Sequence, residues 1–491
     1  MNSPLAIGSI LAIVTHKRLA NFFGLTESLF FEENLAPFMD PFFDFLESVN
    51  GLLWGYVNFA LIVLFGLYFA WKSRLFQFRA MPSAFRLFLK YHTEKSSSDQ
   101  GIAPLKAFYA SLGGCLGVSN IVGVCTAVQI GGPGALFWAW IAAFLGMILK
   151  YSEIYLGMRY RVKNKDGGYD GGPMFYLQKA FRGKWIAVLA CLLLSFYGVE
   201  IYMFNVVVES VSVNWHVSPL LVIAVLLVLT FVAVSGGIRR VATISAKIIP
   251  LFLLLFLAMS FWTMGMNLEK IPAMFRLIVE SAFTPQAGMG AFAGSSVMMA
   301  LSMGISRSCY SSDIGIGYAS VIHATSSNPS AQKQASLSFF SIILDTLVVF
   351  SLSIMVVLVT DIWKMPIDAA LMVQTAFARY FPFVHIFMPI YLFILGYTTI
   401  ISFYAVGEKC LRFVFPKRGR LIFNGYAAVA FIAFSFVDGR AVFTLLSLAG
   451  GGLLMINLIA IFKLRKEIDF TLPAPQQTPQ LIQTEQIEPA G

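Results

Sequence analysis

The sequence predicts an all-α polytopic membrane protein with about eleven transmembrane helices, arranged as a five-plus-five inverted repeat with two broken helices. Only 12% of its 491 residues are charged and 58% are hydrophobic, whereas a soluble domain carries about 25% charged residues. The apolar residues also fall in long runs, close to the roughly 20 residues that a bilayer span needs. Because lipid offers the backbone no hydrogen-bond partners, these runs are predicted to be helices.

The apolar runs define eleven predicted spans. They are 51–71, 104–130, 134–158, 185–209, 217–236, 243–264, 284–304, 336–360, 386–406, 421–437 and 441–462.

The spans divide the chain into five predicted parts. Residues 1–50 are predicted to form an N-terminal interfacial segment, and 51–71 a peripheral transmembrane helix. The two inverted repeats would be 104–264 and 284–462. Residues 467–491 are rich in Gln, Pro, Thr and Glu, so they bury too little apolar surface to fold and are predicted to be a disordered tail.

The basic residues predict the orientation of the chain. If the segment after the first span is cytoplasmic, the cytoplasmic segments hold 26 Lys or Arg and the outer segments hold seven. This asymmetry follows the positive-inside rule. It places the N-terminus outside and the C-terminus in the cytoplasm of a bacterial plasma (inner) membrane. The net charge of +10 is thereby explained by the orientation of the chain in the lipid bilayer, and no nucleic-acid partner is expected.

The second span, 104–130, is interrupted by small residues, and two interpretations are open. Small residues allow close packing of membrane helices, or they mark an unwound segment whose free backbone groups line a binding cavity. The small residues cover every side of the helix, which favours the unwound interpretation. They are Gly113, Gly114, Gly117, Ser119, Asn120 and Gly123.

The span 284–304 carries a similar interruption, with Gly288, Gly290 and Gly294 around Phe292. The two interruptions begin five spans apart, and an odd number of spans inverts the second unit relative to the first. Paired broken helices in inverted halves are the best sequence indication of a secondary-transporter site.

Adjacent hydroxyl residues, Thr398 and Thr399, lie in the apolar span 386–406. Their hydroxyls can bond back to a carbonyl one turn earlier in the same helix. Alternatively, with carbonyls of a broken helix, they can complete the oxygen-rich site that a hard cation prefers.

Four ionisable residues inside spans are costly unless they are paired or face a cavity. Lys150 and Glu153 are three residues apart on one helix face and are predicted to pair with each other. Glu200 has no local basic partner, and we consider a site-facing or proton-carrying role for it. The same applies to Asp345, which lies in mid-span beside Thr346.

Several motifs resemble the alanine or glycine:cation symporter family of the amino acid–polyamine–cation superfamily. The most specific runs from Gly117 to Ala135 and begins Gly-Val-Ser-Asn-Ile-Val-Gly. Further resemblance is found in the segments 146–161, 171–176, 344–347, 397–400 and 407–409.

The resemblance implies a five-plus-five helical fold and uptake of small neutral amino acids driven by Na⁺ or H⁺. It implies substrate contacts at the first break and on neighbouring helices, and a sodium site made of two carbonyls and two hydroxyls. The implied substrate-binding residues are Gly117, Ser119, Asn120, Gly123, Glu200, Met203, Phe292 and Gly294, and the implied sodium ligands are Gly113, Leu116, Thr398 and Thr399.

The chain departs from the family pattern at four places near the implied site. Glu200 replaces a usual asparagine and Met203 a usual glutamine. Val118-Ser119 replaces Thr-Gly, and Ser311-Ser-Asp-Ile-Gly315 replaces Ser-Asn-Glu-Ala-Gly. These changes bear on the substrate and on the coupling ion, and they leave the transporter class intact.

The leading hypothesis is a sodium-coupled symporter of a small neutral amino acid, with sodium as coupling ion and no other cofactor. The alternative is a proton-coupled transporter of a related or cationic amino acid that uses Glu200. A channel or transport-derived receptor is a third possibility. An enzyme is not expected, because the five histidines are scattered.

Overall fold

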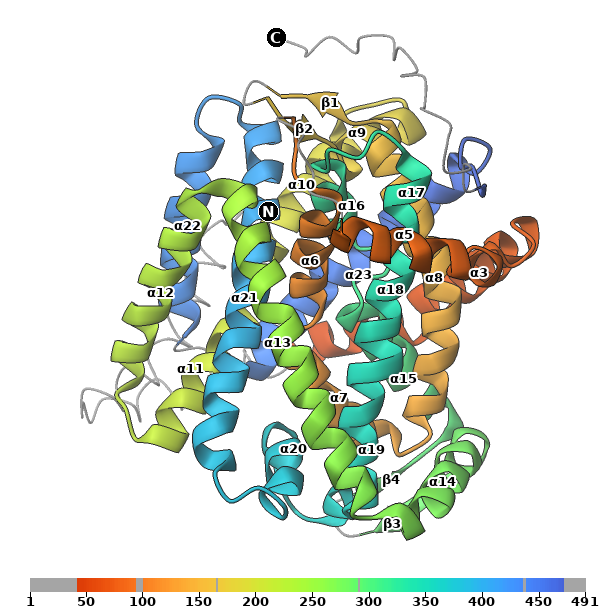
Figure 1. The fold of residues 1–491 in the computed structure, drawn as a ribbon, viewed down its shortest axis with the longest axis vertical. Helices are drawn as coiled ribbons and strands as arrows, with labels where there is room; N and C mark the ends of the chain where they lie inside the picture. Colours follow the sequence, from red (N-terminus) through yellow and green to blue (C-terminus); the bar gives the residue numbers. More distant parts are fainter. Residues whose placement is uncertain (1–41, 94–99, 165–166, 290–291, 436–438, 472–491) are drawn as a thin grey trace.

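The computed structural model describes residues 42–93, 100–164, 167–289, 292–435 and 439–471, most of them in helices (Figure 1). Seven of the described helices are long and apolar enough to cross a bilayer, and a bent pair of shorter helices can form one more span. Two shorter apolar helices, Pro219–Ser235 and Gly419–Phe434, coincide with predicted spans. The all-α polytopic class is therefore confirmed. The count of eleven and the division into inverted repeats stay predictions.

The first part of the chain contains four of the long apolar helices. One of them, Phe42–Lys72, includes the π-helical turn η1. The elements are η1 (Leu53–Asn58), α3 (Phe59–Lys72), α4 (Phe76–Arg79), α5 (Met81–Thr93), α6 (Pro104–Cys115), η2 (Val118–Asn120), α7 (Gly123–Gly131), α8 (Ala135–Arg159), β1 (Val162–Lys163), β2 (Tyr169–Asp170), α9 (Pro173–Phe181), α10 (Trp185–Tyr197), α11 (Ile201–Trp215), α12 (Pro219–Ser235) and α13 (Gly237–Gly265).

The second part contains the other three long helices and several short connecting ones. Its elements are η3 (Leu268–Lys270), α14 (Ile271–Phe283), β3 (Gln286–Met289), β4 (Phe292–Ser295), α15 (Val297–Ser311), α16 (Tyr318–Ala324), α17 (Ala331–Ser336), α18 (Ser338–Ile342), η4 (Ile343–Phe350), α19 (Ser351–Val359), η5 (Ile362–Lys364), α20 (Ala369–Ala378), α21 (Val384–Val414), α22 (Gly419–Phe434) and α23 (Gly439–Lys463).

The outer face of α12 shows how the helices meet the membrane. Its exposed side chains include Leu221, Val225, Val228 and Val232, which recur every three or four residues. This spacing places them on one side of the helix. An exposed apolar stripe on a helix without basic or acidic residues is suited to lipid and not to water.

The predicted broken span 284–304 is wrong. Residues 286–289 and 292–295 form an antiparallel hairpin, in which Gln286 pairs with Ser295, and Gly290 lies outside the described residues. Closely spaced glycines disfavour a helix because each costs about 1 kcal/mol relative to alanine. The helix begins only at Val297, where the Ser296 hydroxyl accepts a hydrogen bond from the Met299 N–H.

A different interruption lies after α15, between Ser312 and Gly317. Gly315 and Gly317 have φ of +77° and +108° there, a conformation that glycine adopts without steric cost. The helix resumes as α16. The break in this part of the chain thus follows α15, whereas the glycines that predicted it precede α15.

The predicted span 185–209 corresponds to one long apolar stretch, Trp185–Trp215, which carries a local interruption. Its two parts are α10 and α11, and Glu200 lies between them with φ +49°. Gly198 lies where α10 packs closely on α21, since an added Cβ would lie 2.9 Å from the Phe403 carbonyl oxygen. The continuous helix that its apolar run predicted is therefore interrupted near its middle.

Segments predicted to lie on opposite sides of the membrane lie at opposite ends of the molecule. In Figure 1, β1, β2 and α9 lie at the top, whereas α14, β3, β4 and α20 lie at the bottom. The first group comes from a segment predicted to be cytoplasmic. In the second group, α14 and α20 come from predicted outer segments, whereas β3 and β4 come from the start of the predicted span 284–304. The arrangement agrees with the alternation of sides, while the absolute orientation stays a prediction from the basic residues.

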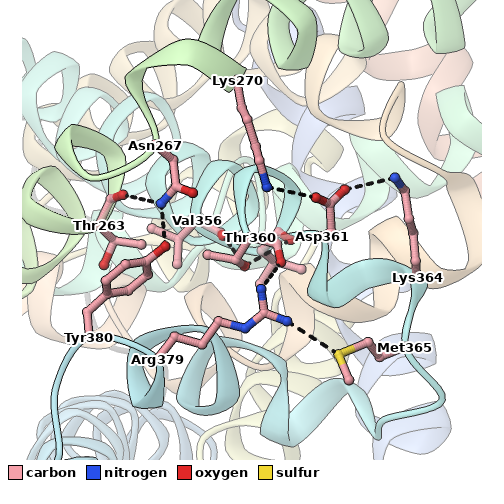
Figure 2. A network of polar contacts seen from close by, with 11 residues as sticks. Thr263, Asn267, Lys270, Val356, Thr360, Asp361, Lys364, Met365, Arg379 and Tyr380 are labelled. Atoms are coloured by element: carbon pink, nitrogen blue, oxygen red, sulfur yellow. Dashed lines mark hydrogen bonds and ion pairs between the residues drawn. The ribbon is translucent and has the colours of Figure 1, made fainter.

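A polar network joins α13, α19 and α20 at the bottom end (Figure 2). The Asp361 carboxylate accepts hydrogen bonds from Lys270 at 3.0 Å and from Lys364 at 2.8 Å. Nearby, the Asn267 amide donates to the Thr263 carbonyl at 2.9 Å and contacts the hydroxyl of Tyr380. These contacts tie the end of α13 to the loop segments that follow α19.

Candidate functional site

The predicted unwound segment lies between α6 and α7, whose axes differ in direction by 59°. The α-helix ends at Cys115 and resumes at Gly123. Between them the only helical turn is the short η2. The Gly117 N–H donates a hydrogen bond to the Cys115 carbonyl at 2.9 Å. It therefore does not make the usual helical bond to the Gly113 carbonyl four residues earlier. The Asn120 amide oxygen accepts a hydrogen bond from the same N–H at 3.1 Å. The break therefore releases a helix carbonyl inside the protein.

Thr399 faces that released carbonyl. Its hydroxyl oxygen lies 3.0 Å from the Gly113 carbonyl oxygen and 3.2 Å from that of Leu395. Gly117 is equally close, since an added Cβ would lie 2.7 Å from the Thr399 hydroxyl. The oxygen atoms of Gly113, Leu395 and Thr399 thus lie together in one buried place between α6 and α21, as a hard cation requires.

The other two predicted sodium ligands lie close by, with less direct geometry. The Thr398 hydroxyl donates to the Leu395 carbonyl at 2.9 Å, which is the local bonding that an isolated helical threonine also makes. Leu116 follows the last residue of α6, with ψ of 84°. Both side chains are buried. The oxygen-rich donor set fits sodium, and Thr399 with Gly113 forms its best-defined part.

A narrow apolar cavity adjoins the break. Its wall includes Asn120 and Gly117, and otherwise consists of apolar and aromatic side chains from four helices. The lining residues are Leu116, Gly117, Asn120, Ile249, Phe252, Leu253, Val349, Tyr391 and Leu395. A cavity with few polar groups beside an unwound backbone is typical of small-ligand sites.

Asn120 connects this break to a second polar cluster. Its amide nitrogen donates to a carboxylate oxygen of Asp345 at 2.7 Å. The hydroxyls of Ser311 and Ser312 also contact that carboxylate, from the end of α15. Thr346 contributes a third hydroxyl at 3.0 Å. Asp345 lies in η4, and π-helical turns of this kind occur frequently at functional sites.

The two interruptions lie side by side. The Tyr318 hydroxyl at the start of α16 donates to the Ala110 carbonyl of α6 at 2.9 Å. This approach depends on Gly114, because a Cβ there would lie 2.1 Å from the Tyr318 hydroxyl oxygen. The Cys115 thiol also donates to the Ser312 carbonyl, at 3.6 Å. A rearrangement of one break would therefore be transmitted directly to the other.

Comparison with known proteins identifies the class of the molecule. The sequence profile of the sodium:alanine symporter family matches residues 39–474. The chain belongs to the sodium:alanine symporter family. The membership confirms the resemblance read from the motifs, and it makes the chain a sodium-coupled amino-acid symporter of the membrane and not an enzyme.

Relatives in this family match almost over their full length. A transporter of Haemophilus influenzae is 30% identical over 432 residues, which cover 86% of this chain and 94% of that protein. The sodium/alanine symporter AgcS of Methanococcus maripaludis is 28% identical, with 86% and 95% covered. The probable sodium/glutamine symporter GlnT of Bacillus subtilis is also 28% identical, with 85% and 87% covered.

The fold is shared with a more distant transporter. The structure of a Na⁺-coupled sialic acid symporter matches with a TM-score of 0.54 at 10% sequence identity, and the match covers 84% of this chain and 87% of that one. At this identity the likeness concerns the fold alone.

The predicted ion pair between Lys150 and Glu153 is wrong. The Lys150 ammonium instead donates to the Ser312 carbonyl at 2.5 Å and to the Cys115 sulfur at 3.3 Å. Glu153 accepts a hydrogen bond from the Ser320 N–H at 3.2 Å. Spacing on one helix face favoured the pair, but carbonyls released by both interruptions offer the ammonium other acceptors. Lys150 therefore links the two breaks.

Glu200 and Met203 lie apart from the cavity beside Asn120 and are not among its lining residues. Both are 2% exposed. One carboxylate oxygen of Glu200 is buried and has no hydrogen-bond partner in the described part of the chain. The structure therefore places the Glu200 carboxyl at the interruption between α10 and α11, as a buried group with unused bonding capacity.

The remaining predicted site residues fall in two places. Ser119 lies in η2 with its hydroxyl 3.5 Å from the Asn120 amide oxygen, and Gly123 begins α7. Phe292 and Gly294 lie in β4, which packs beside α7. The first two belong to the break, whereas the other two belong to the hairpin that replaces the predicted second break.

The sequence does not identify Ser311 and Ser312 as site residues, and it assigns Asp345 no partner. A signal existed for both. An acidic residue in an apolar span is a functional-site candidate by default, and the run from Ser311 to Gly317 contains glycines at 315 and 317. Which hydroxyls meet the carboxylate depends on the packing of η2, α15 and η4.

Proposed function

We propose that this sodium-coupled symporter carries a small neutral amino acid of the alanine or glycine type into the cell. The observation that carries the proposal is the 3.0 Å approach of the Thr399 hydroxyl to the released carbonyl of Gly113. Gly113, Leu116, Thr398 and Thr399 would ligate Na⁺. The substrate would bind at the neighbouring break beside Asn120, with Gly117, Ser119 and Gly123 shaping the backbone.

The chemistry of the break supports this substrate class. Unwound backbone presents N–H groups to a carboxylate and C=O groups to an ammonium, which every amino acid carries. The adjoining cavity is narrow and its lining is largely apolar, which suits a small side chain without charge. Relatives are named for alanine and for glutamine, and the apolar lining of the cavity favours the methyl group of alanine over the amide of glutamine.

Coupling follows from the shared backbone. The Gly113 carbonyl and the Asn120 side chain belong to opposite ends of one interruption. An ion that fixes the position of α6 relative to α21 also fixes the segment that would hold the substrate. Binding of either ligand would therefore raise the affinity for the other by the same factor.

The test is uptake by purified protein in proteoliposomes, with labelled alanine, glycine and glutamine under separate Na⁺ and H⁺ gradients. Thr399→Val keeps the side-chain shape but removes one oxygen ligand, so half-maximal uptake should require at least about tenfold more Na⁺, equivalent to about 1.4 kcal/mol. Thr230→Val is the matched control, because Thr230 is a buried threonine of α12. Unchanged sodium dependence in Thr399→Val would contradict the proposed ligand.

A second candidate function is proton-coupled transport of a related or cationic amino acid. One observation favours it, namely the buried and unpartnered carboxylate oxygen of Glu200 at a helix interruption. Glu200→Gln preserves shape but cannot ionise. If Glu200 carries the proton, uptake driven by a pH gradient disappears while substrate exchange persists. If sodium is the coupling ion, Na⁺-driven uptake stays near the wild-type rate.

A further inference from the structure

The segment that follows the first long helix forms α4 and α5, and three faces of α5 differ in character. One face packs on the protein. Ala84 on this face is fully buried, and the centre of the Phe88 ring lies 5.3 Å from the ring centres of Phe108 and of Phe340. Because Phe108 belongs to α6, this contact joins α5 to the helix that ends at the break.

A second face of the segment is apolar and exposed. Phe85 and Leu89 are 51% and 49% exposed, and their spacing of four residues places them on one side of α5. Phe78 in α4 is also 49% exposed, and it is preceded by the exposed side chains of Trp71 and Leu75. Large apolar side chains that are grouped on a surface helix mark a contact with a membrane or with another protein.

A third face is basic. An exposed arginine or lysine directly follows each exposed phenylalanine and leucine of α4 and α5, so an apolar and a basic stripe run side by side, about 100° apart around the helix. Residues 71–93 contain no Asp or Glu. No carboxylate in the described part of the chain forms an ion pair with Arg74, Arg79 or Arg86. The exposed basic residues of the segment are Lys72, Arg74, Arg79, Arg86 and Lys90.

The place of this segment favours a membrane over a protein partner. It begins where the long apolar helix Phe42–Lys72 ends, and in Figure 1 α5 runs across the long axis of the molecule, in the same half as β1, β2 and α9. A helix that lies along a membrane surface buries its apolar face among acyl chains and keeps its basic face at the headgroups. The predicted orientation places this half toward the cytoplasm, where the leaflet carries anionic lipids.

We propose that α4 and α5 form a binding site for an anionic phospholipid of the cytoplasmic leaflet. Arg79 and Arg86 would hydrogen-bond the headgroup phosphate, whereas Phe85 and Leu89 would contact the acyl chains. Arginine suits this role because its planar guanidinium binds a phosphate with two parallel hydrogen bonds. The proposal rests on the predicted orientation, and not on the coupling ion or the transported amino acid.

A lipid in this site would act on the helix that ends at the break. The bound lipid fixes α5, and α5 holds Phe108 of α6 through Phe88. Phosphatidylglycerol should therefore raise the thermal unfolding midpoint of the wild type more than that of a variant without the basic stripe.

The test is lipid binding by purified full-length protein in detergent, measured by native mass spectrometry during titration with phosphatidylglycerol. Phosphatidylcholine with the same acyl chains is the lipid control, and the wild type should bind it at least about tenfold more weakly. Arg79→Gln combined with Arg86→Gln should weaken phosphatidylglycerol binding roughly thirtyfold, since each basic residue near an anionic surface contributes a factor of about five.

Lys417→Gln combined with Arg418→Gln is the matched control variant. It removes two exposed charges from the turn between α21 and α22, so it should change phosphatidylglycerol binding less than about twofold. Equal binding of both lipids by the wild type, or an equal loss in both double variants, would overturn the site. Displacement of the lipid by inorganic phosphate would identify a soluble anion as the ligand, and a dimer lost in the Arg79 and Arg86 variant would identify a second copy of the chain. Either result would overturn the lipid proposal, and neither bears on sodium-driven uptake.

Discussion

Two aspartates of this symporter, Asp345 and Asp361, have carboxylates that are stabilised in different ways. Asp361 lies just after the end of α19 with 45% of its side chain exposed, and two lysine ammonium groups contact it (Figure 2). Asp345 is fully buried, and its contacts are hydroxyls and one amide. A carboxylate with ammonium partners is already neutralised. A carboxylate whose contacts are hydroxyls and an amide is stabilised by hydrogen bonds instead.

The difference follows from location. Near the surface, long lysine side chains reach a carboxylate and keep their ammonium groups in water, so an ion pair forms at little cost. In the membrane interior each permanent cation costs several kcal/mol to desolvate. Short hydroxyl side chains add little such cost, and they stabilise the carboxylate by hydrogen bonds without adding a second buried charge.

The largest effect is expected from Lys150, which lies beside the Asp345 cluster without touching the carboxylate. Lys150→Met removes the ammonium that joins the Ser312 carbonyl to the Cys115 sulfur, and it leaves buried carboxyl groups uncompensated. We expect a loss of about 3–5 kcal/mol of unfolding free energy, measured by thermal and denaturant unfolding in detergent. Lys106→Met is the control, because Lys106 is exposed. A loss below about 1 kcal/mol would show that Lys150 is not needed to balance these charges.

Asn120 should be the most sensitive residue for transport. Asn120→Ala removes both the bond to the Gly117 N–H and the bond to Asp345. Saturable amino-acid uptake should be abolished, although the protein still reaches the membrane. Asn214→Ala is a suitable control, since the Asn214 amide donates only to the Ser210 carbonyl within α11 and contacts Gln374 through its oxygen. Preserved uptake with reduced thermal stability would instead assign Asn120 a packing role.

Substitutions at two glycines of the break distinguish an effect on the sodium site from an effect on the backbone of the whole segment. At Gly117 an added Cβ would lie 2.7 Å from the Thr399 hydroxyl, whereas at Gly123 the nearest atom would be 3.5 Å away, in Ser119. Gly117→Ala should therefore displace that hydroxyl and raise the sodium requirement of uptake about tenfold, about 1.4 kcal/mol. Gly123→Ala should leave it unchanged. An equal rise of the sodium requirement in both variants would mean that the backbone of the segment is disturbed, and not the Thr399 hydroxyl alone.

The sequence allowed the helices to be predicted well where hydropathy alone decides. The run 134–158 became α8 (Ala135–Arg159), and the glycines near Gly117 marked a real break. In both places the local composition is enough to determine the backbone. The five-plus-five division into repeats stays a prediction, since no feature of the helix list tests it.

The second break and the Asp345 cluster could not be predicted in the same way. Glycines at 288, 290 and 294 and glycines at 315 and 317 carry similar local signals, and tertiary pairing selects the hairpin at one and the interruption at the other. The contacts of Asp345 join residues 225 and 34 positions apart. Such distances along the chain are set by helix packing, which hydropathy does not encode.

The smallest effect is expected at Asp361, and it completes the comparison. Partial burial raises the pKa of Asp361, but hydrogen bonds from Lys364 and Lys270 and their charges outweigh it, so the pKa lies below its usual range. A lowered folded-state pKa adds stability above the unfolded pKa of about 3.9 and loses it as the pH falls through the folded-state pKa. Because the side chain is 45% exposed, solvent screening limits the gain to about 0.2–1 kcal/mol.

Asp361→Asn should therefore lower the unfolding free energy at pH 7 by less than about 1 kcal/mol, and the difference from the wild type should be smaller at about pH 3, below the unfolded pKa of about 3.9. Thermal unfolding in detergent at both pH values measures this directly. Sodium-driven uptake should stay at the wild-type rate, because the Asp361 charge is neutralised by lysines and not by the transported ion. A raised sodium requirement in this variant would place Asp361 on the ion pathway and would remove the distinction between the two carboxylates.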